Sequence, residues 1–211
     1  MRPNFALTAL ASILVIAMSG CHSDVHDHDH DHHGHNHDPN EVMTTVKLTF
    51  TPNSGGDAVV AKWADPENDG SPVIDDIVLA KGETYTLTME VLNELEKPAE
   101  DMTKEIKDEQ DEHQVFFYGE SVEGPGSTAT KALVKHSYND LDNNDFPIGL
   151  SNLVEAVEAG EGKFYVMLRH LPPVNGKAIK TGSLAADFKA SGESALPGSA
   201  DISVDFKLTV K

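Results

Sequence analysis

Apolar and polar residues alternate along much of the chain after Met43. The first such segment places Val46, Leu48 and Phe50 on one side, with polar residues between them. Period-two alternation is typical of a β-strand with one face in a hydrophobic core. The alternation returns at 85–91, 164–168 and 202–210, and further strands are expected at 58–63, 77–80, 115–118, 132–138 and 150–157. Gly, Pro and Asn clusters separate these segments, which favours an all-β, antiparallel Ig-like β-sandwich.

One segment has a helical pattern instead. Met102 and Ile106 lie four residues apart in a strongly charged stretch, which predicts one short helix at about 98–111. Pro98 is expected in the first turn of this helix, where a proline is tolerated. The helix should pack against the edge of the sandwich and lead into the strand that begins near His113.

The first 20 residues are typical of a secretory signal. Arg2 precedes an apolar run at 5–18 that is too short to span a bilayer. The run ends in Met18-Ser19-Gly20-Cys21, which resembles a bacterial lipobox. The resemblance implies cleavage before Cys21, lipidation of that residue and anchoring in a membrane. The expected organisation is therefore a signal peptide at 1–20, a linker at 21–41 and one β-sandwich domain at 42–211.

A histidine-rich segment follows Cys21. It has no apolar periodicity, so we expect it to be disordered until a ligand orders it. Imidazole is the commonest metal ligand in proteins and Asp supplies oxygen ligands, but imidazole alone does not select among Zn²⁺, Ni²⁺ and Cu²⁺. The segment is interpreted as a metal-binding tail or, alternatively, as a solvated spacer. Its candidate ligands are His22, His26, His28, His30, His32, His33, His35, His37, Asp27, Asp29 and Asp31.

Three histidines lie outside the tail. His113 and His170 stand at ends of predicted strands, where an ordered metal site can form. Carboxylates at Glu109, Asp111 and Glu112 could complete a zinc shell or orient an imidazole. The third histidine, His136, alternates with apolar residues, which favours a structural role over metal ligation.

An acidic loop is a candidate calcium site. Asp140, Asp142 and Asn144 alternate like the first ligands of a calcium loop. The glycine and the distal glutamate of an EF-hand are missing from the stretch that follows. An Asx-rich turn, in which the side chains bond to their own backbone, is the competing interpretation.

The composition argues against several functions. The formal charge is −19, from 35 acidic and 16 basic residues, so the chain repels nucleic acid. The sequence contains no HExxH, GxSxG or phosphate-binding glycine motif, and its one cysteine is Cys21. We therefore expect a binding protein that is not an enzyme.

Two resemblances complete the interpretation. The His/Asp tract resembles segments of zinc-uptake proteins and nickel chaperones that collect or buffer metal. The segments VMTTVKLTFTP, YNDLDNNDFPIGL and YVMLRHLP, within about 42–210, resemble a group of uncharacterised bacterial lipoproteins, sometimes labelled a type 1 periplasmic binding fold. That label implies a doubly wound α/β fold, which the period-two pattern contradicts. The group is associated with TonB-dependent outer-membrane receptors, which implies such a receptor as a partner.

These observations lead to one expected function and one alternative. The first is a lipid-anchored metal-binding protein of the cell envelope that collects zinc, or another transition metal, for a receptor or transporter. Histidine, not aspartate, follows Cys21, which favours sorting to the outer membrane. The alternative is a structural or adhesive Ig-like module on a solvated tether, which binds protein or glycan.

Overall fold

The computed structural model describes residues 42–211. The expected signal peptide, Cys21 and the candidate ligands of the tail lie outside the described residues. All the strands, both helices and both hydrophobic clusters of the described part fall between residues 43 and 210. Residues 40–211 form one compact unit by themselves. Because its core is complete within this unit, we expect a fragment of residues 40–211 to fold independently.

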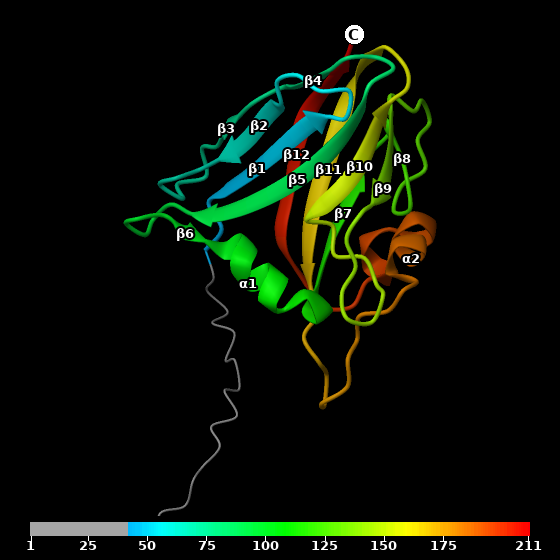
Figure 1. Cartoon of the computed structure of the whole chain (residues 1–211). Coiled ribbons are helices and arrows are strands. Elements are labelled where there is room, and N and C mark those ends of the chain that lie inside the picture. The colour runs from blue at the N-terminus through cyan, green and yellow to red at the C-terminus, as the bar shows by residue number, and fades with distance from the viewer. Residues whose placement is uncertain (1–41) are drawn as a thin grey trace, which may run out of the picture. The chain divides into compact units, whose positions relative to one another are not determined.

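The described part of the chain is a mainly-β sandwich of two sheets, which confirms the all-β prediction (Figure 1). The larger sheet has the strand order β3-β2-β1-β5-β10-β9-β8, with β6 on β5. Its strands are β1 (Thr45–Pro52), β2 (Val59–Ala64), β3 (Val73–Ile74), β5 (Thr84–Asn93), β6 (Glu100–Asp101), β8 (Val122–Glu123), β9 (Val134–Tyr138) and β10 (Ser151–Ala156). The smaller sheet has the order β4-β12-β11-β7. Its strands are β4 (Ile77–Leu79), β7 (His113–Tyr118), β11 (Gly160–His170) and β12 (Ser199–Val210). All pairs are antiparallel except β4 with β12 and β8 with β9.

The main core lies between the two sheets. The alternating apolar residues predicted to face inward are buried, among them Leu48 and Leu87 from the larger sheet and Val166 and Phe206 from the smaller one. Burial of apolar surface is the dominant favourable term in folding. The period-two pattern therefore identified the inner face of the long strands correctly.

A second hydrophobic cluster covers the outer face of the smaller sheet. Its centre is α2 (Leu184–Ser191), whose Phe188 packs against Phe116 of β7 with ring centroids 5.2 Å apart. Residues of β7 are consequently buried on both faces of the strand. The prediction of a single short helix was wrong, because α2 is a second helix in the described residues. Its signal in the sequence is the spacing of Leu184, Ala185 and Phe188.

The predicted helix exists but is shorter than expected. It spans α1 (Met102–Asp108) and is followed by a 3-10 turn, η1 (Gln110–Glu112). Asp101 is its N-cap and accepts a hydrogen bond from the Thr103 backbone N–H, so the helix begins after Asp101 and Pro98 lies ahead of it. Met102 and Ile106 are buried in the main core, as their spacing indicated. Figure 1 shows α1 leading to the end of the sandwich where β7 and β11 meet.

Candidate metal centre

Strand pairing brings the two candidate histidines together. His113 begins β7, His170 ends β11, and the two residues are direct partners in the antiparallel pair. Facing residues of an antiparallel pair project to the same side of the sheet. The imidazole rings are stacked, with centroids 4.7 Å apart and planes 8° from parallel. His113 shares its side of β7 with Val115 and Phe117, so the pair lies at one end of the sandwich interior.

The segment between α1 and β7 brings carboxylates to the same place. Glu109 is the C-cap of α1, where its backbone N–H donates to the Glu105 carbonyl. A ligand atom of Glu109 lies within 4.8 Å of one on each histidine. Glu112, at the end of η1, places Oε2 4.0 Å from Nε2 of His170. Two of the three carboxylates proposed from the sequence thus lie beside the histidines.

Hydrogen bonding fixes which His113 nitrogen carries the lone pair. The Nδ1 atom lies 3.1 Å from the Glu109 carbonyl oxygen, which can only accept, so Nδ1 is the donor. In a neutral imidazole the lone pair is then on Nε2. A backbone carbonyl that holds Nδ1–H is a common way to orient a metal-binding histidine. The same carbonyl accepts the Glu112 backbone N–H at 2.8 Å, which fixes the turn that carries both groups.

The ligand atoms of Glu109, His113 and His170 are separated by distances not far above those between the ligands of a bound zinc ion. Ligand atoms of a tetrahedral zinc site lie about 3.3 Å apart, given Zn–N distances of about 2.0–2.1 Å. The atoms of Glu109, His113 and His170 lie within 4.8 Å of one another, so contraction by small side-chain rotations is required. Parallel rings cannot direct both lone pairs at one ion, so the rings must also tilt. The side chains of His170 and Glu112 have exposed fractions of 15% and 27%, so the group lies near the surface, although Nε2 of His170 and Oε2 of Glu109 are themselves buried.

Backbone contacts hold the end of β11 in place beside these donors. The Leu171 N–H donates to the Glu112 carbonyl at 2.6 Å, which closes η1 onto the strand end. Gly198, just before β12, has φ +73° and lies so close to His170 that a side chain there would collide with the His170 carbonyl oxygen. Glycine adopts this left-handed conformation without a steric cost. The position of His170 therefore depends on Gly198.

The expected calcium ligands have other roles in the structure. The Asp140 carboxylate accepts backbone N–H bonds from Gly149, Leu150 and Ser151 at 2.8–2.9 Å. Burial raises the pKa of this carboxyl, although these three bonds oppose the change. Asp142 faces a buried lysine, described below, instead of open solvent. These contacts favour the competing interpretation, an Asx-rich turn that bonds to its own backbone, and calcium binding stays a prediction.

His136 has the structural role that its alternation indicated. The residue is buried in β9, and its Nε2 lies 3.0 Å from Oδ1 of Asn152. Its ring contacts Phe117 and Tyr138, with centroids 4.8 Å and 4.9 Å away. Burial lowers the pKa of His136 to about 4, despite the hydrogen bond to Asn152. His136 does not belong to the His113 and His170 group.

A groove of about 450 Å³ lies elsewhere on the domain. It is lined by the aromatic rings of Tyr118 and Phe188 and by the hydroxyl residues Ser127 and Thr128. Lys189 and Glu193 also line it, and they form ion pairs with Glu123 and Arg169, respectively. Tyr118 is at the opposite end of β7 from His113, so the groove is separate from the histidine pair.

Comparisons with protein families, with curated proteins and with solved structures found no match. The resemblance to a lipoprotein group stays a prediction. Among the described residues, no helix is long and apolar enough to cross a bilayer.

Proposed function

We propose that this chain is a metal-binding protein of the cell envelope that holds one transition-metal ion, in the first place Zn²⁺, at Glu109, His113 and His170. The observation that best supports this proposal is that a carboxylate and two imidazoles, from two distant parts of the chain, have ligand atoms within 4.8 Å of one another. Two histidines and one glutamate are a donor set that zinc sites use, with a further position open. Ni²⁺ and Cu²⁺ also accept imidazole and are the competing ions.

Glu112 is the proposed fourth donor. Its carboxylate is 4.0 Å from the His170 imidazole and lies on the same turn as Glu109. Two carboxylates bring two negative charges to the ion, which offset the charge of a divalent cation. Because Glu112 is partly exposed, it can leave the ion while the other donors remain. This arrangement suits a protein that takes up and releases metal.

The His/Asp tail is proposed to collect metal for this site. Its eight histidines follow the proposed lipid anchor at Cys21, which would keep the collected ion near a membrane. Flexible histidine tracts bind metal through whichever imidazoles converge, so their affinity is expected to be lower than that of an ordered site. Delivery to a TonB-dependent outer-membrane receptor is the proposed next step, and neither the tail nor the domain is proposed to catalyse a reaction.

Zinc titration calorimetry on two fragments tests this proposal. Residues 40–211 should bind one ion, and residues 22–211 should bind additional, weaker ions. His170→Gln, which removes one of the two imidazole ligands, should abolish tight binding by the 40–211 fragment. His136→Gln is the matched control, because it replaces a histidine outside the cluster. Absence of zinc binding by residues 40–211, or equal binding by the His170→Gln variant, would refute an ordered site.

One observation favours the alternative of a module that binds protein or glycan. The groove at Tyr118 and Phe188 combines aromatic rings with hydroxyl groups, which suits contact with the apolar face of a sugar. This function predicts binding that needs neither metal nor tail. A glycan panel probed with residues 40–211 and with Tyr118→Ala, in the presence of EDTA, separates the two functions.

A further inference from the structure

The acidic loop between β9 and β10 is held in one conformation by its own side chains. Besides the three bonds to Asp140, Oδ1 of Asp142 accepts the backbone N–H groups of Asn144 at 2.8 Å and Phe146 at 2.9 Å. A carboxylate that accepts several backbone N–H bonds is a strongly held group. The loop is therefore a rigid support against which another segment can be fixed.

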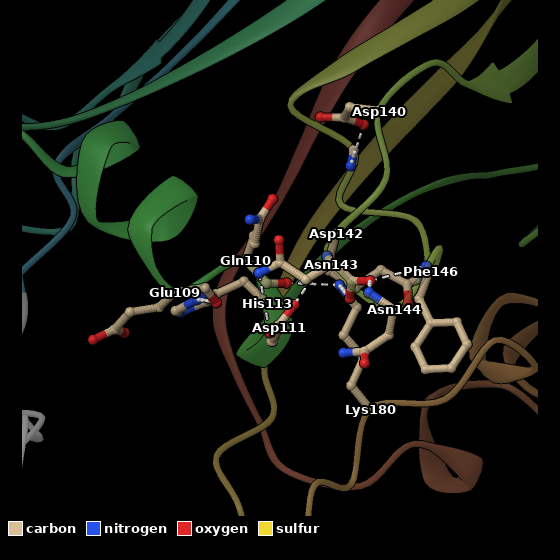
Figure 2. A network of polar contacts seen from close by, with 12 residues as sticks. Glu109, Gln110, Asp111, His113, Asp140, Asp142, Asn143, Asn144, Phe146 and Lys180 are labelled. Atoms are coloured by element: carbon tan, nitrogen blue, oxygen red, sulfur yellow. Dashed lines mark hydrogen bonds and ion pairs between the residues drawn. The ribbon is translucent and has the colours of Figure 1, made fainter.

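That other segment is the turn that carries the proposed metal ligands. Lys180 is buried, and its Nζ atom lies 2.8 Å from Oδ2 of Asp142 and donates to the Gln110 carbonyl at 2.8 Å. A second link comes from Asn143, whose backbone N–H and side-chain amide donate to the two carboxylate oxygens of Asp111 at 3.2 Å and 3.3 Å. Figure 2 shows both links between the loop and the turn.

Both links bind residues that lie between the proposed ligands Glu109 and His113 in the sequence. Gln110 and Asp111 lie in η1, directly after Glu109 and just before His113. Within the same turn, the Glu109 carbonyl orients the His113 ring. A displacement of Gln110 or Asp111 therefore changes the distance between the Glu109 carboxylate and the His113 imidazole.

The cost of the Lys180 and Asp142 pair suggests a role beyond stability. Both side chains are almost fully buried, with exposed fractions of 1% and 0%. Removing two charges from water carries a desolvation penalty that their attraction often does not exceed, so a pair of apolar residues would commonly serve stability as well. A charged lysine can, however, donate to a carboxylate and to a backbone carbonyl at once, which an apolar side chain cannot do.

We propose that Lys180, Asp142 and Asn143 form a loop anchor that positions Glu109 and His113 for metal binding. This inference rests on the proposed function, because it assigns a positioning role toward the same site. Lys180 and Asn143 contact residues next to the ligands, Asp142 holds Lys180, and none of the three is a proposed ligand. Loss of groups that orient metal ligands typically weakens metal affinity about 10- to 100-fold, and we expect a loss of this size.

The test is a Co²⁺ titration of residues 40–211, in which visible absorption reports both affinity and ligand geometry. The first variant is Asp142→Asn with Lys180→Met, which removes both buried charges while the Asn oxygen can still accept the N–H groups of Asn144 and Phe146. The second is Asn143→Ala, a milder change near the surface. The matched control is Lys163→Met with Asp205→Asn, which removes an exposed ion pair of the same 2.8 Å length between β11 and β12.

The expected result is weaker Co²⁺ binding and an altered spectrum for both anchor variants, with the control unchanged. Metal-free melting and circular dichroism show whether each variant is folded at the temperature of the titration. Wild-type affinity and spectrum in the folded double variant overturn the anchor. If the double variant does not fold, wild-type binding by Asn143→Ala has the same meaning. If the wild-type fragment binds no Co²⁺, or His170→Gln binds it equally well, the proposed function fails and the anchor fails with it.

Discussion

Acidification should destabilise the domain through His136. Burial lowers the pKa of this imidazole from 6.5 to about 4 in the folded state. Asn152 donates its side-chain N–H to the Gly149 carbonyl, so its oxygen faces His136 and the ring donates through Nε2. The remaining nitrogen, Nδ1, is buried and has no hydrogen-bond partner among the described residues. Protonation would place a charged N–H there without an acceptor.

The sign and size of the effect follow from proton linkage. Between pH 6.5 and pH 4 the unfolded chain binds a proton at His136 and the folded chain does not. The free energy of unfolding therefore falls as the pH is lowered through this range. Below about pH 4 His136 is protonated in both states and causes no further change. At about 1.4 kcal/mol for each pH unit of pKa difference, the full loss is about 3 kcal/mol, and about 2 kcal/mol is lost by pH 5.

Urea denaturation of residues 40–211 at several pH values measures this loss, with Trp63 as the fluorescent probe. EDTA in every sample keeps metal binding out of the comparison. The reference is His136→Gln, which has no charge to gain, so its stability should fall by about 2 kcal/mol less than that of the wild type between pH 7 and pH 5. Parallel pH profiles for the two proteins would show that His136 does not titrate between the two states, and the reasoning would be wrong.

Three further predictions concern the fold and the acidic loop. Phe206→Ala, at a fully buried position between the sheets, should lower the free energy of unfolding by about 3–5 kcal/mol in urea denaturation, and an equal loss in exposed Lys207→Ala would contradict this. Asp101→Ala should cost about 1 kcal/mol because α1 loses its N-cap bond to Thr103, while Asp101→Asn should retain most of the stability. Calcium at millimolar concentration should leave the melting temperature of residues 40–211 unchanged, since the loop carboxylates already bond to backbone N–H groups and Lys180; an upward shift would restore the calcium interpretation.

The alternation of apolar and polar residues predicted the strands well because each long strand has one face in the main core between the sheets. The alternation at Val46, Leu48 and Phe50 depends only on which side is buried, and that information is present in the sequence itself. The strands of the smaller sheet are different where α2 covers their outer face. Met167 and Phe116 are buried on that second side, so the pattern there becomes a continuous apolar run and no longer indicates which face is inside.

The candidate site was only partly predictable for a related reason. The sequence indicates that His113 and His170 stand at strand ends, and that Glu109 and Glu112 are near His113 along the chain. It does not show that β7 and β11 are neighbours with these two histidines opposite each other. Strand order depends on contacts between distant segments, whereas alternation is a local property. The assignment of a joint site therefore needed the sheet topology.

The acidic loop shows how the same residues support opposite conclusions. Asp140, Asp142 and Asn144 have the spacing of calcium ligands, and a sequence lists oxygen atoms without showing what they bind. In the structure a lysine from a distant segment lies beside Asp142, and backbone N–H groups surround Asp140. A cation is thus present at this loop, but it is the chain's own ammonium group. Because that group also donates to the Gln110 carbonyl, we propose that the acidic loop supports the proposed metal site at Glu109 and His113 and does not itself bind the ion.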